Sequence, residues 1–152
     1  MHRDMKPEEI DALLTSQTFG SLACQQDGKP YIIPLAYFYD FNAIYGQTME
    51  GKKTEILRRN PQVCFHVQEL QPDGWRSALC WGVFEEVDLS APLTPAMLTA
   101  LQGLAVRLGV VQQSVGVKVL FDASGASSAA GPKGTVFRIR VTEKTGRAFH
   151  SD

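Results

Sequence analysis

The sequence predicts a mainly β protein, an antiparallel β-barrel with peripheral helices. Three observations favour this class. About seven strand-like segments stand against three helical ones, the connections between strands are short, and no alternating strand and helix series predicts a parallel sheet. At 152 residues the chain can bury a substantial core, so we expect one domain over residues 1–152.

Two segments predict amphipathic helices. In KPEEIDALLTSQ (6–17), Pro7 suits the first helical position, acidic residues follow in the first turn, and apolar residues recur at helical spacing. In LTPAMLTALQGLAVRLG (93–109), Thr94 is a candidate N-cap. The apolar stripe expected on this second helix comprises Met97, Leu98, Leu101, Leu104, Ala105 and Leu108.

GSLAC (20–24) and PYIIPLAYFYD (30–40) predict a β-hairpin. The segment between them contains Asp-Gly, a dipeptide typical of two-residue turns between antiparallel strands. The second strand is apolar on both faces, with Ile32, Pro34, Ala36 and Phe38 on one and Tyr31, Ile33, Leu35, Tyr37 and Tyr39 on the other. Both faces therefore need cover, which a closed barrel with something packed outside would supply.

The next strands are expected in NAIYGQ (42–47), PQVCFHVQEL (61–70) and WRSALCWGVFEEV (75–87). Val63, Phe65 and Val67 alternate along the middle one and should share a face. Gly82 in the last one predicts a bulge, a barrel bend or the close approach of a ligand.

The C-terminal part contains two further strand candidates. VKVLFD (117–122) comes first, and ASGASSAAGPKG (123–134) follows it as a flexible, low-complexity connection. TVFRIRVTEKTGR (135–147) is the final strand, in which apolar residues alternate with Arg138 and Arg140.

The charge balance excludes several classes of partner. Lys and Arg total 15 against 16 Asp and Glu, so no global excess favours nucleic acid or an anionic membrane.

No apolar run resembles a signal peptide or reaches the length of a membrane span, so we expect a cytoplasmic protein. Cys24, Cys64 and Cys80 form no CxxC pair that would suggest zinc, and we expect them to be reduced and buried.

EGKKTEILRRNP (50–61) places Lys52 and Lys53 at the start of an expected short helix. The first N–H groups of a helix lack intrahelical partners, and positively charged side chains are mildly unfavourable at that end of the helix. A bound anion such as phosphate would accept hydrogen bonds from these N–H groups and offset the unfavourable lysine charges. Gly51 could bring the backbone close to such a ligand. The alternative is a solvated helix face in which Glu55 pairs with Arg58 or Arg59.

Taken together, residues 3–87, with the final strand included, resemble the flavin-binding split-barrel proteins related to pyridoxamine 5′-phosphate oxidase, in particular the nitroimidazole-reductase-like branch. The most specific features are the basic pair followed by Asn60-Pro61, and the strand start Trp75-Arg76-Ser77 that leads to Gly82. The resemblance implies an antiparallel split barrel of the FMN-binding type. It also implies a homodimer that binds FMN in two equivalent clefts at the subunit interface.

The same resemblance implies a set of cofactor-binding residues. Lys52 and Lys53 match the basic pair that holds the FMN phosphate. The strand that lines the isoalloxazine ring corresponds to Pro34, Leu35, Ala36 and Tyr37. Gln47 and Thr48 match the loop beside the ring and the ribityl chain. Arg76 and Ser77 match a strand whose side chains reach the flavin, and Trp81 is expected to contribute from the partner subunit.

The implied function is an FMN-dependent oxidoreductase that passes electrons from NAD(P)H to a small acceptor. Gln47 stands where related proteins commonly have a histidine, and an amide cannot exchange a proton near neutral pH. No catalytic acid or base is therefore identified. The C-terminal substrate-binding segment of a true pyridoxamine phosphate oxidase is not recognisable either, so that activity is not assigned.

Other interpretations stay open. The protein could bind or store flavin without turnover, or the same barrel could hold a deazaflavin or a haem. His66 would be the haem ligand, although a lone strand histidine is more often a polar surface group. Trp75 and Trp81 fit core or dimer-interface packing better than catalysis.

Overall fold

The computed structural model describes residues 1–109 and 134–152. The helices within these ranges are α1 (Pro7–Ser16), α2 (Lys52–Arg59) and α3 (Pro95–Arg107). The strands are β1 (His2–Asp4), β2 (Phe19–Gln26), β3 (Lys29–Ala36), β4 (Phe38–Tyr39), β5 (Ala43–Met49), β6 (Gln62–Gln71), β7 (Gly74–Glu86) and β8 (Gly134–His150). The expected strand over 117–122 and almost all of the connection over 123–134 lie outside the described residues.

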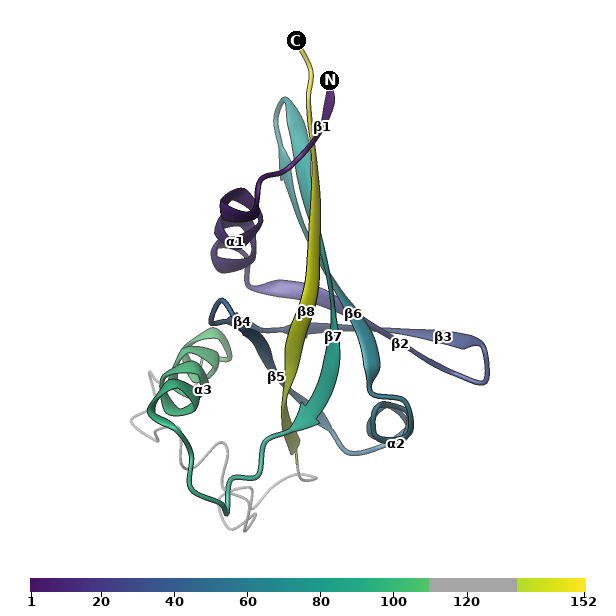
Figure 1. The fold of residues 1–152 in the computed structure, drawn as a ribbon, viewed down its shortest axis with the longest axis vertical. Coiled ribbons are helices and arrows are strands. Elements are labelled where there is room, and N and C mark those ends of the chain that lie inside the picture. The colour runs from purple at the N-terminus through teal and green to yellow at the C-terminus, as the bar shows by residue number, and fades with distance from the viewer. Residues whose placement is uncertain (110–133) are drawn as a thin grey trace.

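All of these strands belong to one antiparallel sheet. Its order is β3-β2-β6-β7-β8-β5-β4, and β1 pairs with β8 off this path. The sheet curls so that β3 approaches β5, although the two are not hydrogen-bonded neighbours. A Cβ added to Gly46 in β5 would lie 3.2 Å from Leu35 Cδ1 in β3. The helices lie around this sheet (Figure 1), which confirms the expected antiparallel barrel with peripheral helices.

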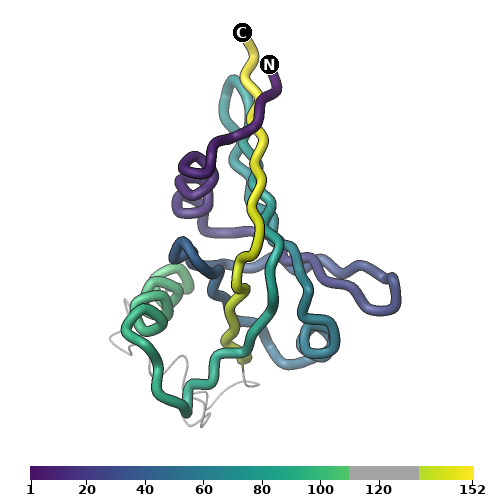
Figure 2. The backbone as a smooth tube through the Cα atoms, in the orientation of Figure 1, coloured from purple at the N-terminus to yellow at the C-terminus, as the bar shows by residue number. Residues whose placement is uncertain are grey.

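One end of the sheet extends into a narrow arm formed by β6, β7 and β8 (Figure 2). The two chain termini lie side by side on this arm because β1 pairs with the end of β8, with His2 opposite Phe149. The ring centroid of Phe149 lies 4.8 Å from His2 and 6.4 Å from Trp75. The short strand β1 was not expected from the sequence, since its residues carry no strand pattern.

The β2–β3 hairpin turns as the Asp-Gly dipeptide predicts. Asp27 and Gly28 both have positive φ, 52° and 77°. A two-residue loop with both residues in this region is the primed turn that matches the twist of an antiparallel pair. The turn sets the register that places Gln26 opposite Lys29.

The expected irregularity at Gly82 is a β-bulge. The register of β7 against β8 shifts between Trp81 and Gly82. A Cβ added to Gly82 would lie 2.4 Å from the carbonyl oxygen of Arg140. Of the three possibilities raised by the sequence, the structure therefore shows a bulge with close backbone approach, which a side chain would prevent.

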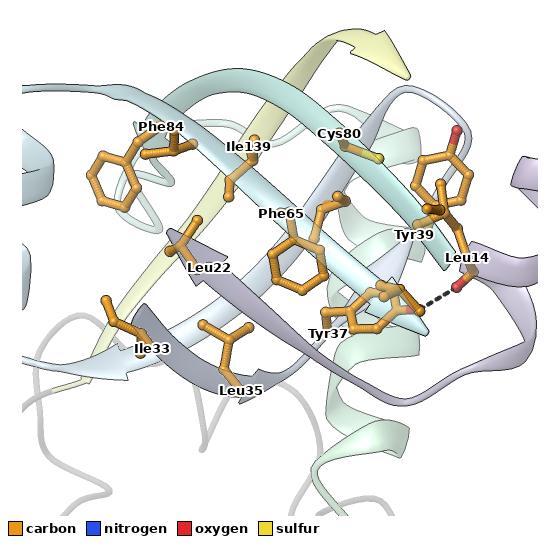
Figure 3. Close-up of a cluster of buried hydrophobic side chains, with 14 of the residues drawn as sticks. Leu14, Leu22, Ile33, Leu35, Tyr37, Tyr39, Phe65, Cys80, Phe84 and Ile139 are labelled. Carbon is orange, nitrogen blue, oxygen red and sulfur yellow. Dashed lines mark hydrogen bonds between the residues drawn. The ribbon is translucent and has the colours of Figure 1, made fainter. Parts of the chain in front are cut away.

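The main core lies inside the curled sheet and beneath α1 (Figure 3). Val63, Phe65 and Val67 all point into it, as their alternation predicts. The rings of Phe65 and Tyr37 meet edge to face, with centroids 5.1 Å apart. The Tyr37 hydroxyl donates a 2.6 Å hydrogen bond to the Leu14 carbonyl, which joins α1 to the barrel.

A second apolar cluster lies under α3. The Thr94 hydroxyl accepts a 3.2 Å hydrogen bond from the Met97 N–H, so the expected cap is confirmed. Leu101 and Leu104 are buried against β5 residues such as Tyr45. The expected stripe is wrong at Leu98, which is 45% exposed and is not part of this cluster.

The three cysteines are free; Cys24 and Cys80 are buried and Cys64 is half-buried. Within residues 1–109 and 134–152, no helix is both long and apolar enough to span a membrane.

Candidate functional site

The start of α2 carries the two expected phosphate ligands. Lys52 and Lys53 are exposed, and neither takes part in an ion pair within the described part of the chain. The first-turn N–H groups of any helix lack intrahelical acceptors. This helix end therefore combines backbone donors with two ammonium groups.

Gly51 has extended backbone at the N-cap of α2, with φ of 162°. A Cβ added there would meet no atom within 4 Å, so the single chain does not require glycine at this position. The Thr54 hydroxyl accepts a 3.0 Å hydrogen bond from the Gly51 N–H and lies 3.1 Å from the Glu50 carboxylate. These contacts hold the helix start in place.

Arg58 forms a bridge between two carboxylates. It pairs with Glu50 and with Glu86, each at 2.6 Å. The alternative reading, in which Glu55 pairs with Arg58 or Arg59, is not what the described residues show, because two carboxylates from outside the helix bind Arg58 instead. Hydrogen bonds from Arg58 and from the Thr135 hydroxyl lower the pKa of Glu50 to about 2. Arg58 thus offsets the acid nearest the helix start, while Lys52 and Lys53 stay available.

The four positions expected at the isoalloxazine ring, three in β3 and Tyr37 directly after it, point alternately to opposite faces of the sheet. Pro34 is exposed and Ala36 is half-buried, both on the outside of the sheet. Leu35 and Tyr37 are buried in the core (Figure 3), where Tyr37 bonds to α1. Leu35 and Tyr37 can therefore offer a ligand only their main-chain groups.

Gln47 and Thr48 lie in strand β5 rather than in a loop. They are half-buried and pair with Val136 and Thr135 of β8. A Cβ added to Gly134 would fall 2.4 Å from Gln47 Nε2. Gly134 thus leaves the space that the Gln47 amide occupies.

Arg76 and Ser77 are adjacent in β7 and so project to opposite faces of the sheet. Arg76 forms an ion pair with Glu69 of β6, with Nε 2.8 Å from Glu69 Oε2. Ser77 shares its face with Trp81, and its Oγ lies 2.9 Å from His66 Nε2. The two matched residues therefore cannot approach one ligand from the same side.

We call the surface that carries Ser77 the outer face of the sheet. Cross-strand partners on it are Ser21 with Pro34 and with His66, and His66 with Leu79. Its residues are Phe19, Ser21, Ala23, Ile32, Pro34, Ala36, Cys64, His66, Gln68, Ser77, Leu79 and Trp81. Large apolar side chains are exposed on it: Phe19 is 69%, Ile32 71% and Trp81 37% exposed.

A groove of about 320 Å³ runs across this region. It is lined by Ala23, Cys24, Gln25, Gln62, Val63, Cys64 and Trp81. No hydrogen bond or ion pair within the described residues joins Lys52 or Lys53 to Ser77 or Trp81. Of the candidate residues, the groove is lined by Trp81 but not by Lys52, Lys53 or Ser77.

Sequence reasoning missed two parts of this arrangement. Phe19 and Leu79 were not singled out, although their alternation with buried residues in β2 and β7 could have placed them beside Ile32 on one face. The Arg58 bridge was missed because its partners, Glu50 and Glu86, lie 8 and 28 residues away along the chain. No local sequence pattern indicates the contact between Arg58 and Glu86.

Comparison with known proteins places this geometry in a family. An uncharacterized protein of Rhizobium meliloti strain 1021 is 31% identical over 86 residues. The match covers 56% of this chain and 57% of that relative, so the chain spans little more than half of the relative's length.

Two solved structures share the fold over nearly the whole chain. An FAD-binding protein from Mesorhizobium loti has a TM-score of 0.69 at 28% identity, covering 98% of this chain and 99% of its own. A protein from Bacteroides thetaiotaomicron, provisionally described as a 5-nitroimidazole antibiotic resistance protein, has a TM-score of 0.62 at 16% identity. That alignment covers 98% of this chain and 88% of the other, and at this identity it supports the fold alone.

The family model described as pyridoxamine 5′-phosphate oxidase matches residues 6–148. This range runs past residue 87 and includes the final strand β8, which the sequence resemblance also took in. The split-barrel fold that these structures share agrees with the predicted fold class. The chain belongs to the pyridoxamine 5′-phosphate oxidase family of flavin-type split barrels.

Proposed function

We propose that this protein binds FMN as a homodimer, with the cofactor at the subunit interface, and passes electrons from NAD(P)H to a small acceptor. The observation that carries the proposal is the start of α2, where Lys52 and Lys53 are exposed and free of ion pairs among the described residues. Family membership and the FAD-binding neighbour support a flavin as the ligand.

The residues of this chain fit the three chemical parts of FMN. Lys52 and Lys53, with the backbone donors of α2, suit the phosphate. Gln47 and Thr48 provide polar groups for the ribityl hydroxyls. Pro34 and the backbone of β3 offer an apolar strand for the ring. When bound, the flavin supplies the electron transfer, and the protein binds and orients it.

The first experiment is a flavin titration of the protein freed of any bound chromophore. FMN and riboflavin differ only in the phosphate, so Lys52→Ala/Lys53→Ala should weaken FMN by about 10- to 100-fold, since a hydrogen bond to a charged group contributes roughly 1.5–3 kcal/mol. Riboflavin affinity should change by less than about twofold. FAD also carries phosphate, and its affinity relative to FMN identifies the preferred flavin.

A matched control removes two positive charges elsewhere. Lys6→Ala/Lys29→Ala changes two exposed lysines at α1 and at the β2–β3 hairpin, and it should leave FMN affinity unchanged. Equal losses of FMN and riboflavin in the Lys52/Lys53 variant would contradict the phosphate assignment. Failure of the unaltered protein to retain FMN, FAD or riboflavin would refute flavin binding itself.

The outer face supports the homodimer part of the proposal. Phe19, Ile32 and Trp81 expose a large apolar area on one side of a sheet whose other side is already a core. Exposed apolar patches of this kind are typical of interaction surfaces. A second copy would cover the face, and it would also bring Trp81 of one chain toward the candidate residues of the other.

The oligomeric state tests this surface. Ile32→Asp places a carboxylate on the outer face and should convert a dimer into a monomer of 16.7 kDa in light scattering. Leu98→Asp is the matched control, because Leu98 is also an exposed branched aliphatic residue but lies on α3, away from the outer face. An unchanged mass for Ile32→Asp, with native circular dichroism, would place the interface elsewhere.

Turnover separates the oxidoreductase from a flavin storage protein. A storage protein would bind FMN but oxidise neither NADH nor NADPH with any small acceptor. For the haem alternative, His66 would have to present a ring nitrogen to iron, yet its Nε2 is already held by Ser77 at 2.9 Å. The absorption spectrum of the protein distinguishes flavin, deazaflavin and haem directly.

A further inference from the structure

We propose that Gly134 is a positioning residue of the flavin site, because its missing side chain lets the Gln47 amide lie over β8 and reach the ribityl chain of the flavin. This inference rests on the proposed flavin function, in which Gln47 serves the ribityl hydroxyls. It adds to the site a residue at the start of β8 that the sequence resemblance did not indicate.

Gln47 projects from the side of β5 that faces away from the inner core. A Cβ added to its neighbour Gly46 would lie 2.7 Å from the Phe137 ring and 3.2 Å from Leu35 Cδ1, and both of these residues belong to that core. Adjacent residues of a strand point to opposite faces, so Gln47 points outward. Its side chain is half-buried and is therefore accessible to a ligand.

Two residues of β8 lie diagonally across from Gln47 on the same face, and they differ in size. Val136 is the direct partner of Gln47, so the diagonal neighbours are Arg138 and Gly134. The long side chain of Arg138 is engaged by Glu85, to which its Nε donates a 2.9 Å hydrogen bond. Gly134 is exposed and has no side chain, which leaves room on that diagonal.

The Gln47 amide occupies the room that Gly134 leaves. A Cβ added to Gly134 would collide with Gln47 Nε2 and would lie 3.1 Å from Cδ and 3.2 Å from Cγ. Carbon atoms that are not bonded pack at about 3.5–4.0 Å, so any side chain at position 134 would displace the amide. The displaced atoms form the end of a flexible side chain, and the fold itself should therefore tolerate the change.

The direction of the Gln47 amide matches the position of the basic pair. Gly134 lies opposite Met49, which follows Gln47 along β5, and α2 begins shortly afterwards at Lys52. The amide is therefore turned toward the end of β5 that leads to Lys52 and Lys53. In FMN the ribityl hydroxyls lie between the phosphate and the ring, so the amide is turned toward the part of the ligand that adjoins a phosphate bound at α2.

The chemistry of the amide suits this part of the flavin. An amide offers two N–H donors and a carbonyl acceptor, and hydroxyl groups both donate and accept. A methyl group at position 134 would turn the amide away and remove these hydrogen bonds. Riboflavin has the same ribityl chain as FMN but no phosphate. Loss of the Gln47 contact should therefore weaken both flavins equally, whereas loss of Lys52 and Lys53 should weaken only FMN.

The first test uses the unaltered, flavin-free protein. Nuclear Overhauser spectra should show a cross-peak between the side-chain NH₂ group of Gln47 and the Hα atoms of Gly134. Cross-peaks from this NH₂ group to Arg138 in place of Gly134 would show that the amide takes the other diagonal, and they would overturn the inference without any reference to flavin.

The second test is a double-mutant cycle read by titration with FMN and with riboflavin. Gly134→Ala and Gln47→Ala should each weaken both flavins by about 3- to 10-fold, the expected effect of losing a neutral hydrogen bond. Gln47→Ala/Gly134→Ala should bind no more weakly than Gln47→Ala, because the new methyl group then has no amide to displace. Thermal unfolding of Gly134→Ala should match that of the unaltered protein.

The outcomes separate the positioning role from the proposed function. Unchanged flavin affinities in Gly134→Ala, or losses that multiply in the double variant, would overturn the role of Gly134 and leave flavin binding standing. A large loss of thermal stability in Gly134→Ala would also overturn it, since the position would then serve the fold. Absence of flavin binding in the unaltered protein would overturn the proposed function, and this inference with it.

Discussion

The two faces of the same sheet differ in burial although both are apolar. Along β3, Ile33 and Leu35 on the inner face are 4% and 8% exposed, while the neighbouring Ile32 on the outer face is 71% exposed. Phe65 on the inner face is completely buried, whereas Phe19 on the outer face is 69% exposed. Side-chain hydrophobicity therefore does not decide burial within one chain. What decides it is whether α1 and the curled sheet enclose that face.

The polar groups follow the same division. On the inner side, the Tyr37 hydroxyl bonds to Leu14, and Lys144 lies 2.7 Å from Asp11, which also accepts from Tyr39. No buried side-chain polar atom lacks a partner in the described residues. On the outer side, the His66–Ser77 pair stays half-buried and accessible. The inner face is thus complete in one chain, and the outer face is available to a partner or ligand.

The largest expected effect comes from deleting an inner aromatic ring. Phe65→Ala should lower the free energy of unfolding by about 3–5 kcal/mol, because it removes a fully buried ring that packs against Tyr37. Phe19→Ala should change it by about 0.5 kcal/mol or less when the chain is monomeric. Urea denaturation in the Ile32→Asp background compares the two. Similar losses would show that the outer face is as enclosed as the inner one.

A smaller effect is expected where only a polar atom is removed. Tyr37→Phe leaves the ring in place but deprives the buried Leu14 carbonyl of its 2.6 Å donor, which should cost about 1–3 kcal/mol. Tyr31→Phe, at a half-buried position of β3, is the control and should be nearly neutral. A neutral Tyr37→Phe would mean that α1 is attached by its apolar residues alone.

The smallest effect concerns pH and the Asp11–Lys144 pair at the edge of the inner core. Burial, the strongest influence, raises the pKa of Asp11, but hydrogen bonds from Lys144 and Tyr39 outweigh it and leave the pKa below 3.8. A lowered pKa in the folded state means that Asp11 stabilises the fold above its ordinary pKa. This contribution is lost as pH falls through the folded-state value.

Asp11→Asn should therefore cost about 1 kcal/mol at pH 7, and the difference from the unaltered protein should shrink as the pH falls through the folded-state pKa of Asp11. Thermal unfolding at pH 7, 5, 3 and 2 measures it. Asp27→Asn is the control, since Asn also tolerates the positive φ of the hairpin turn. A difference that stays constant with pH would mean that the Asp11 charge does not stabilise the fold.

Much of the fold could be predicted from local patterns. Pro7 and Thr94 mark helix starts, Asp27-Gly28 marks a primed turn, and the alternation of Val63 to Val67 marks a strand with one buried side. Each depends on interactions within a few residues, which sequence spacing reports directly. Part of the candidate site was predictable in the same way, because Lys52 and Lys53 lie at a helix start that the sequence itself indicates.

The directions of the other candidate residues could not be predicted in this way. The resemblance assigned Leu35 and Tyr37 to a ligand, but both side chains face the core; it grouped Arg76 with Ser77, but the two project to opposite faces. Alternation along a strand shows that neighbours diverge. It does not show which side becomes the core, because that depends on the strands and helices that pack there.

Short-range backbone preferences and residue spacing were enough to predict the mainly antiparallel class, the helix starts, the hairpin turn and the basic pair before Thr54. Long-range packing brings Arg58 between Glu50 and Glu86, brings His66 to Ser77, and leaves one apolar face of the sheet exposed. These features join residues from different elements. Their free energies depend on distances that the curvature of the whole sheet sets.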